Sequence, residues 1–169
     1  MLRSIMVSKT GDKSKIKIRK ARSADIDKIC QIEAQQFTNP WKQDYFTNEL
    51  DHHIAYFYIG EDTDSREILG YIIFWIIEDM LELHKIAVSA DSTGKGIGKQ
   101  LFGFMLDTAR TNGVEELFLE VRKSNAGAIK LYEAFQFQLI DVRKAYYPDP
   151  IEDALIYKLV LNNTENIPS

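Results

Sequence analysis

The chain of 169 residues lacks several features that define specialised classes of protein. It has a single cysteine, Cys30, which excludes an internal disulfide and favours a reducing compartment. Its three histidines, His52, His53 and His84, show no metal-ligand spacing with cysteine or acidic residues, so we expect no metal. No apolar run reaches membrane-spanning length, so we expect no membrane partner. The net charge of −4 argues against general nucleic-acid binding.

The first twenty residues are rich in lysine and arginine, and Asp12 is their one acidic residue. A basic segment of this kind is compatible with targeting, but it lacks the apolar core of a secretory signal. We therefore expect residues 1–14 to be a flexible basic tail and residues 162–169 to be a C-terminal tail. The length between them fits one domain over residues 15–161, and we expect a cytoplasmic protein.

Hydrophobic patterning predicts the element order β-α-α-β-β-β-α-β-α-β-β, which is an α+β fold with a mixed sheet. Ser23 is expected to cap the first helix, and the apolar run Tyr71–Ile77 is typical of a central strand covered on both faces. The predicted strands cover residues 15–21, 54–60, 67–77, 81–88, 115–122, 136–146 and 152–160. The predicted helices cover residues 24–36, 41–51, 97–111 and 125–134.

The most informative segment is the apolar strand end Ile86–Val88 followed by the glycine-rich turn Thr93–Lys99 and a helix. Glycines at positions 94, 96 and 98 let the backbone approach a ligand closely. A helix N-terminus offers unpaired N–H groups and a partial positive charge. The pattern predicts an anion site, most naturally for phosphate. A tight turn without a ligand is the alternative interpretation.

Three kinds of phosphate loop compete for this turn. A P-loop requires a hydroxyl residue where Gln100 stands, and a dinucleotide fingerprint requires glycine where Lys99 stands. The turn is similar to the acetyl-CoA loop of the GCN5-related N-acetyltransferases (the GNAT family), Gln/Arg-x-x-Gly-x-Gly/Ala. Gly96 and Gly98 fit that loop, and Thr93 replaces the usual glutamine or arginine.

Two further residues suggest acid–base chemistry. Glu120 interrupts an apolar strand, and strand alternation places it on the face opposite Leu119. A half-buried carboxylate is a better base than an exposed one, although a structural ion pair with a nearby arginine or lysine is the alternative. Tyr132 lies seven residues after Asn125, a good helix N-cap. A tyrosine can protonate a leaving thiolate, and a packed core tyrosine is the alternative.

Several segments together make the resemblance to the GNAT family specific over about residues 15–161. Within the family, the chain resembles the enzymes that acetylate the N-terminal alanine of a ribosomal protein. It departs from their pattern at Thr93, at Gln136 where glycine is usual, and in its basic N-terminal extension. The matching segments are Leu119–Arg122, Ser124–Ala126, Ala128–Ile129, Leu131–Glu133 and Tyr146–Pro148, with Phe37, Pro40 and Trp41.

The resemblance implies an acyl-CoA N-acyltransferase fold, with a mostly antiparallel sheet of about seven strands splayed at the acetyl-CoA site and about four helices. Acetyl-CoA is the implied co-substrate, and a protein N-terminus, from a ribosomal protein, is the implied acceptor. Glu120 is the implied general base and Tyr132 the implied general acid. The implied cofactor-binding residues are Ile86, Ala87, Val88, Gly94, Lys95, Gly96, Ile97, Gly98, Lys99 and Asn125. The implied acceptor-binding residues are Phe37, Trp41, Tyr146 and Tyr147.

Two other functions stay open on the sequence. The enzyme alternative acetylates a small amine or a lysine side chain, and the non-enzyme alternative is an acyl-CoA-binding module without catalysis. A cationic small amine favours a site lined with acids, whereas the expected groove is mainly aromatic. A pure binding module requires neither Glu120 nor Tyr132.

Overall fold

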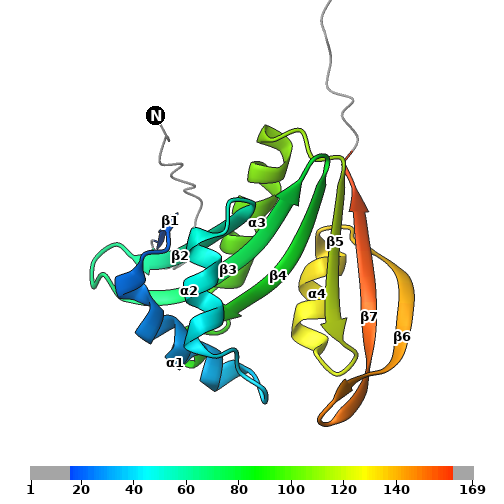
Figure 1. Ribbon diagram of the computed structural model, residues 1–169, viewed down its shortest axis with the longest axis horizontal. Helices are drawn as coiled ribbons and strands as arrows, with labels where there is room; N and C mark the ends of the chain where they lie inside the picture. Colours follow the sequence, from blue (N-terminus) through cyan, green and yellow to red (C-terminus); the bar gives the residue numbers. More distant parts are fainter. Residues whose placement is uncertain (1–15, 162–169) are drawn as a thin grey trace, which may run out of the picture. The chain divides into compact units, whose positions relative to one another are not determined.

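The computed structural model describes residues 16–161, which form the predicted order of elements (Figure 1). The predicted tails, residues 1–14 and 162–169, lie outside the described residues. Seven strands form one sheet in the order β1-β2-β3-β4-β5-β7-β6. The strands are β1 (Ile16–Lys20), β2 (Ala55–Asp62), β3 (Ile68–Ile77), β4 (Met80–Val88), β5 (Glu116–Arg122), β6 (Gln138–Pro148) and β7 (Ile151–Val160). The α-helices are α1 (Ile26–Gln36), α2 (Gln43–Asp51), α3 (Ile97–Thr111) and α4 (Ala126–Ala134).

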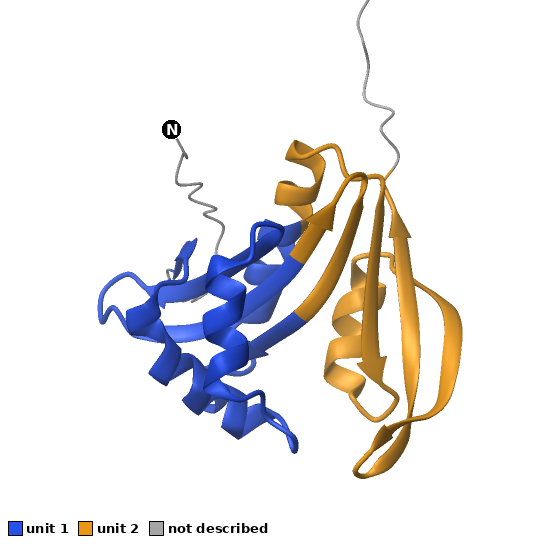
Figure 2. Cartoon of the chain, viewed as in Figure 1, with its two compact units in different colours: residues 1–74, 85–105 blue, residues 75–84, 106–169 orange. Residues whose placement is uncertain are grey.

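The described part of the chain divides into two compact units, the first within residues 1–74 and 85–105 and the second within residues 75–84 and 106–169 (Figure 2). In the first unit, β1 pairs antiparallel with β2. In the second unit, Met80–Leu83 of β4 pair in parallel with Glu116–Leu119 of β5, and β7 pairs antiparallel with both β5 and β6. The sheet is therefore mixed and mostly antiparallel, as the sequence predicted.

The core of the first unit has helices on both faces of its strands. Ile29 of α1 and Phe46 of α2 are fully buried in one cluster with Tyr71 of β3. On the other face, a Cβ built on Gly60 of β2 would lie 3.6 Å from Leu101 of α3. The apolar stripe of α3 is buried, since Ile97, Leu101, Met105 and Ala109 are all buried. Cys30 of α1 is partly buried and packs against this core.

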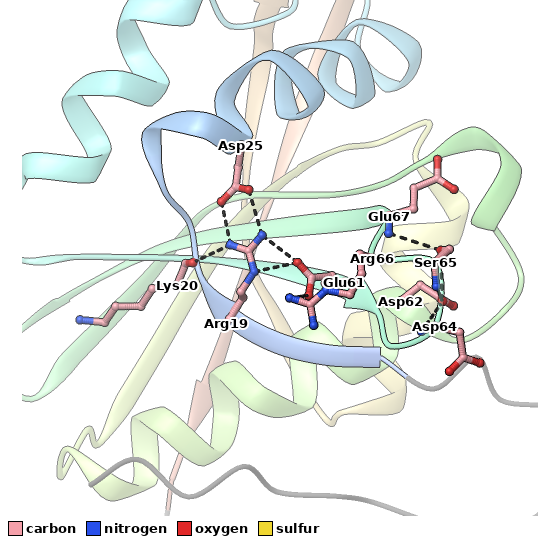
Figure 3. A network of polar contacts seen from close by, with 9 residues as sticks. All are labelled: Arg19, Lys20, Asp25, Glu61, Asp62, Asp64, Ser65, Arg66 and Glu67. Atoms are coloured by element: carbon pink, nitrogen blue, oxygen red, sulfur yellow. Dashed lines mark hydrogen bonds and ion pairs between the residues drawn. The ribbon is translucent and has the colours of Figure 1, made fainter.

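An ion network joins β1, β2 and the start of α1 in the first unit (Figure 3). The Arg19 guanidinium donates from Nη1 to Asp25 Oδ2 at 2.8 Å and from Nε to Glu61 Oε2 at 2.9 Å. Both carboxylates are buried. Arg66, whose side chain is exposed, approaches the second oxygen of Glu61 at 3.0 Å. Because buried charges require partners, Arg19 is the group that makes this polar cluster compatible with folding.

In the second unit, β5 has one buried face. Leu117, Leu119 and Val121 are buried, whereas Phe118 and Glu120 are only partly buried, as strand alternation predicted. Leu119 lies opposite Tyr157 of β7. The Tyr157 ring lies 6.4 Å from that of Tyr132, so α4 covers this face of the sheet.

Several local predictions needed correction. Ser23 does not cap the first helix: Ser23–Asp25 form a short 3-10 helix, and Asp25 accepts the Arg22 N–H at 2.8 Å. The prediction that Tyr71–Ile77 is covered on both faces is correct for Tyr71–Phe74, but Trp75 and Ile76 are only partly buried and Ile77 is 45% exposed. Strand β6 extends to Pro148, beyond its predicted end. Within the described residues, none of the helices combines the length and apolar character needed to cross a membrane.

Candidate active site

The glycine-rich turn has a backbone that favours glycine at two positions. Gly94 and Gly96 both have φ of 77°, in the left-handed region that other residues avoid. A Cβ built on either residue would meet no atom within 4 Å, so the space beside the turn is open. Helix α3 begins at Ile97, as predicted, directly after the turn. Its first N–H groups have no acceptor inside the helix, which is the arrangement expected of an anion site.

Side chains around the turn have distinct roles. The Thr93 hydroxyl donates to the Ala90 carbonyl at 2.8 Å and so stabilises the backbone that leads into the turn. Lys95 and Lys99 are exposed beside it, whereas Ile97 is buried and anchors the start of the helix. The turn therefore presents backbone amides and two cations to solvent while its apolar residue holds it in place.

Strand β4 enters this region through Ile86, Ala87 and Val88, the predicted backbone-binding segment. The Ala87 carbonyl lies 2.7 Å from where a Cβ on Gly70 would be. Glycine at position 70 thus permits the close approach of β3 and β4, because any side chain would displace the β4 backbone.

Phe37 and Trp41 lie in the connection between α1 and α2, and both pack beside the same lysine. The Lys85 ammonium is 3.7 Å from the centre of the Phe37 ring and 5.0 Å from that of Trp41. Lys85 Nζ also donates to Glu33 Oε1 at 2.7 Å. Burial lowers the pKa of Lys85, an effect that the Glu33 carboxylate opposes. These two predicted acceptor-binding residues are therefore held close to the residue that precedes Ile86.

Glu33 is a residue of this region that sequence reasoning missed. It is fully buried and accepts hydrogen bonds from the Trp41 N–H at 2.8 Å and from the Tyr71 hydroxyl. A signal was present, since Glu33 interrupts the apolar stripe of α1 seven residues after Ile26.

In the second unit, Glu120 has two partners. Arg143 of β6 donates to Oε2 at 3.0 Å, and the Tyr147 hydroxyl donates to Oε1 at 3.3 Å. The Glu120 side chain retains 30% of its exposure. The half-buried position is as predicted, and the ion pair that the sequence left as an alternative is present. The Tyr147 hydroxyl therefore has the candidate base Glu120 as a partner within the second unit.

Arg122 fixes the aromatic pair Tyr146 and Tyr147. Its guanidinium lies 4.1 Å from the centre of the Tyr147 ring and donates to the Asp149 carbonyl at 3.1 Å. The rings of Tyr146 and Tyr147 are edge to face at 5.2 Å. Burial, followed by the Glu120 charge, raises the pKa of Tyr147, so its hydroxyl stays protonated at neutral pH.

Tyr132 and Asn125 belong to α4. Asn125 caps the helix as predicted, because its Oδ1 accepts the Ala128 N–H at 3.1 Å. Tyr132 is buried, and burial raises the pKa of its hydroxyl, which keeps the proton that a general acid must donate. Tyr132 packs on the α4 face of the sheet and Glu120 lies on the opposite face of β5.

A cleft of about 250 Å³ opens on the second unit, and Glu120 and Arg143 line it. His84, also of the second unit, stacks on Trp75 with ring centres 4.2 Å apart. Among the described residues, no hydrogen-bond partner is found for its buried Nε2, and Glu82 Oε2 is 3.9 Å away. The remaining lining residues are mainly apolar: Trp75, Ile77, Met80, Leu81, Glu82, Phe118, Leu119 and Ile156.

Each unit thus assembles part of the predicted site. The first holds the turn, the β4 segment, Phe37 and Trp41, and the second holds Asn125, Glu120, Tyr132, Tyr146 and Tyr147. In residues 16–161, no group of three or more histidine, cysteine or acidic side chains is arranged to hold a metal ion.

Comparison with known proteins identifies the class. A model of the acetyltransferase (GNAT) family matches residues 26–137 of the chain. The chain belongs to the GNAT family of acetyltransferases. Its sheet order, single parallel strand pair and four described α-helices are those of the GNAT fold.

Individual relatives are more specific. The chain is 36% identical over 150 residues to a Bacillus subtilis protein provisionally named [ribosomal protein bS18]-alanine N-acetyltransferase, covering 89% of this chain and 99% of that one. It is 31% identical over 147 residues to the Escherichia coli K12 protein of that name, covering 86% and 97%. The crystal structure of the ribosomal-protein-S18-alanine N-acetyltransferase from E. coli matches with a TM-score of 0.79 at 28% identity, covering 90% and 97%.

Proposed function

We propose that this protein transfers an acetyl group from acetyl-CoA to the N-terminal α-amine of a protein, with the N-terminal alanine of ribosomal protein S18 as the acceptor. The observation that carries the proposal is the likeness to bS18-alanine N-acetyltransferases over nearly the full length of both chains. A ribosomal acceptor supports a cytoplasmic location, and the proposed reaction uses acetyl-CoA and a protein N-terminus without a nucleic acid, a membrane or a metal.

Acetyl-CoA fits the groups that the first unit presents. The amides of Gly94–Lys99 cradle the pyrophosphate at the start of α3, where left-handed glycines leave open space. Backbone groups of Ile86–Val88 bind the pantetheine arm and orient the acetyl carbonyl. Asn125 contacts the cofactor near its thiol; because its Oδ1 serves the helix cap, we assign this contact to Nδ2.

In the proposed reaction, the acceptor nitrogen bonds to the acetyl carbonyl carbon while the bond from that carbon to sulfur breaks. Glu120 takes the proton from the amine, directly or through a water molecule, and Tyr132 gives a proton to the departing thiolate. Arg143 and Tyr147 hold the two Glu120 oxygens in place before the acceptor binds. No covalent acyl-enzyme is required, which agrees with the part-buried, packed position of Cys30.

An N-terminal amine suits this machinery better than a lysine side chain. An α-amino group has a pKa of about 7.7–8.0, and a lysine side chain has a pKa of about 10.4. Near neutral pH roughly a tenth of α-amines are already uncharged, against well under a thousandth of lysines. A single carboxylate base is therefore sufficient for an α-amine more readily than for a lysine side chain, because more of the α-amine is already uncharged.

The decisive experiment compares two peptides with the S18-type N-terminal alanine and one internal lysine. One peptide has a free α-amine, and the other is blocked at that amine. We expect the free peptide to be acetylated at the alanine and the blocked peptide to be inert, as read by mass spectrometry with fragmentation. Acetylation of the blocked peptide, or of a polyamine in preference to either peptide, would replace the N-terminal assignment with one of the other amine acceptors. Acetyl-CoA binding without turnover on any amine would indicate a binding module.

A further inference from the structure

The first unit contains a buried carboxylate that the proposed chemistry does not use. Glu33 of α1 is fully buried and receives hydrogen bonds from three different parts of the unit. Lys85 Nζ of β4 donates to Oε1 at 2.7 Å, the Trp41 N–H donates to Oε1 at 2.8 Å, and the Tyr71 hydroxyl of β3 donates to Oε2. The Phe37 N–H also donates to the Glu33 carbonyl, at 3.0 Å.

A charge at this position is costly to bury, so the ion pair is weak evidence that Glu33 is present for stability. Apolar residues that replace a buried ion pair are often neutral or stabilising, because burial strips both charges of water. The carboxylate does fix the positions of the groups that donate hydrogen bonds to it. One oxygen of Glu33 joins the backbone of the connection between α1 and α2 to Lys85, and Lys85 lies beside the Phe37 and Trp41 rings.

We propose that Glu33 is a positioning residue for acceptor binding, which fixes the Phe37–Trp41 segment against Lys85, the residue next to the Ile86–Val88 backbone. The proposal rests on the proposed function, in which Phe37 and Trp41 line the acceptor groove. Glu33 touches neither acetyl-CoA nor the reacting atoms. Its loss therefore weakens acceptor binding while the affinity for acetyl-CoA stays the same.

The test compares Glu33→Gln with Tyr71→Phe. Glutamine keeps the size of Glu33 but removes its charge, so that the side chain cannot hold both the Lys85 ammonium and the Trp41 N–H as firmly. Tyr71→Phe removes a donor to the other oxygen of the same carboxylate and leaves the Trp41 and Lys85 contacts intact. Both variants disturb the same buried network, so Tyr71→Phe controls for a general loss of stability.

Steady-state kinetics with the alanine peptide separates the two variants. For Glu33→Gln we expect the peptide KM to rise on the order of tenfold, the loss of one hydrogen bond to a charged group. We expect kcat and the acetyl-CoA dissociation constant to change less than about twofold. Tyr71→Phe is expected to keep the wild-type peptide KM. Equal changes in both variants, or an equal loss of acetyl-CoA affinity, would overturn the proposal.

A second measurement needs no acceptor and so separates this proposal from the proposed function. The sequence has two tryptophans, so in a Trp75→Phe background the fluorescence reports Trp41 alone. Glu33→Gln is expected to shift the Trp41 emission to longer wavelength, because the segment moves toward solvent, and Tyr71→Phe is not. An unshifted spectrum in a folded Glu33→Gln variant would contradict the positioning role even if no peptide were a substrate.

Discussion

The Glu120 carboxylate binds a guanidinium and a phenol on the open face of β5. Two explanations fit these contacts: Glu120 is the base that accepts the amine proton, or it holds Arg143 and Tyr147 in place. Arg143 is 54% exposed, and an ion pair with one exposed partner contributes little to stability. The two explanations therefore predict different results when each partner is removed in turn.

Replacing Glu120 by glutamine is expected to lower kcat by about 10²–10⁴-fold, the usual contribution of general acid–base catalysis. Arg143→Met removes the same ion pair but keeps the carboxylate, so we expect less than about a tenfold change. Initial rates with the alanine peptide and calorimetry with acetyl-CoA measure both variants, and neither is expected to alter cofactor affinity. Equal losses of kcat in the two variants would mean that Glu120 acts through Arg143 rather than as a base.

The sequence predicted the position of Glu120 but not its partners. Strand alternation fixes the face on which Glu120 lies, since it is a local property. Arg143 is 23 residues away, and it reaches Glu120 through a strand whose pairing with β7 has two register shifts. No periodic pattern reveals such a register. Glu33 shows the same limit: its place on the apolar stripe of α1 can be seen in the sequence, but its partner Lys85, 52 residues away, cannot.

At the scale of elements, the turn before α3 owes its shape to left-handed glycines. Gly113, just after the C-terminus of the same helix, has φ of 71° and is also surrounded by open space. Gly96 and Gly113 thus have similar left-handed backbone conformations at opposite ends of one helix. Only the turn at Gly96 is proposed to bind a ligand, which makes Gly113 a matched control.

Gly96→Ala and Gly113→Ala are each expected to cost about 1–2 kcal/mol of stability, the price of a side chain in the left-handed region. Gly96→Ala is also expected to weaken acetyl-CoA binding at least about tenfold, because its methyl group enters the space beside the anion site. Calorimetric titration at a temperature where both variants are folded measures this difference. If the two variants bind acetyl-CoA equally well, the turn is not the pyrophosphate site.

Elements were predicted well where a local signal is strong and poorly where tertiary contacts decide. The Asn125 cap and the α3 stripe follow from short-range rules and are present. Ser23 has the chemistry of a helix cap, but it lies inside a short 3-10 helix that follows Arg22, and Asp25 binds both Arg19 and the Arg22 N–H. Gln136 adopts φ of 66°, a conformation that glycine usually provides in the family. The packing of the segment after α4 therefore holds Gln136 in a backbone conformation that residues other than glycine rarely adopt.

At the scale of the whole molecule, the order of strands and helices follows from the sequence, whereas the charges that hold the fold together do not. Arg19 lies between Asp25 and Glu61 and joins β1, β2 and the start of α1 (Figure 3). Removing Arg19 leaves two buried carboxylates without their shared partner. Loss of one partner of a buried ion pair typically costs about 3–5 kcal/mol.

Arg19→Met is therefore expected to lower the unfolding temperature strongly at pH 7, as measured by circular dichroism. The matched control is Arg110→Met, which breaks an exposed pair with Asp107 on α3 and is expected to change stability by less than about 1 kcal/mol. Both changes replace an arginine by the same residue, so the difference between them reports the burial of the Arg19 network.

The pH dependence of the unfolding temperature tests whether the charges of the Arg19 network cause the effect of Arg19→Met. The hydrogen bonds from Arg19 hold the pKa of Asp25 below its usual range. A carboxyl group with a depressed folded-state pKa adds stability above its unfolded pKa of about 3.9, and that stability is lost as the pH falls through the folded-state pKa. In Arg19→Met this contribution is absent, and acid neutralises the Asp25 carboxylate that has lost its arginine partner. We therefore expect the gap in unfolding temperature between wild type and Arg19→Met to narrow from pH 7 to pH 3, while the Arg110→Met gap stays small throughout. A gap that is constant with pH would show that Arg19 stabilises the fold by packing of its alkyl chain rather than by its charge.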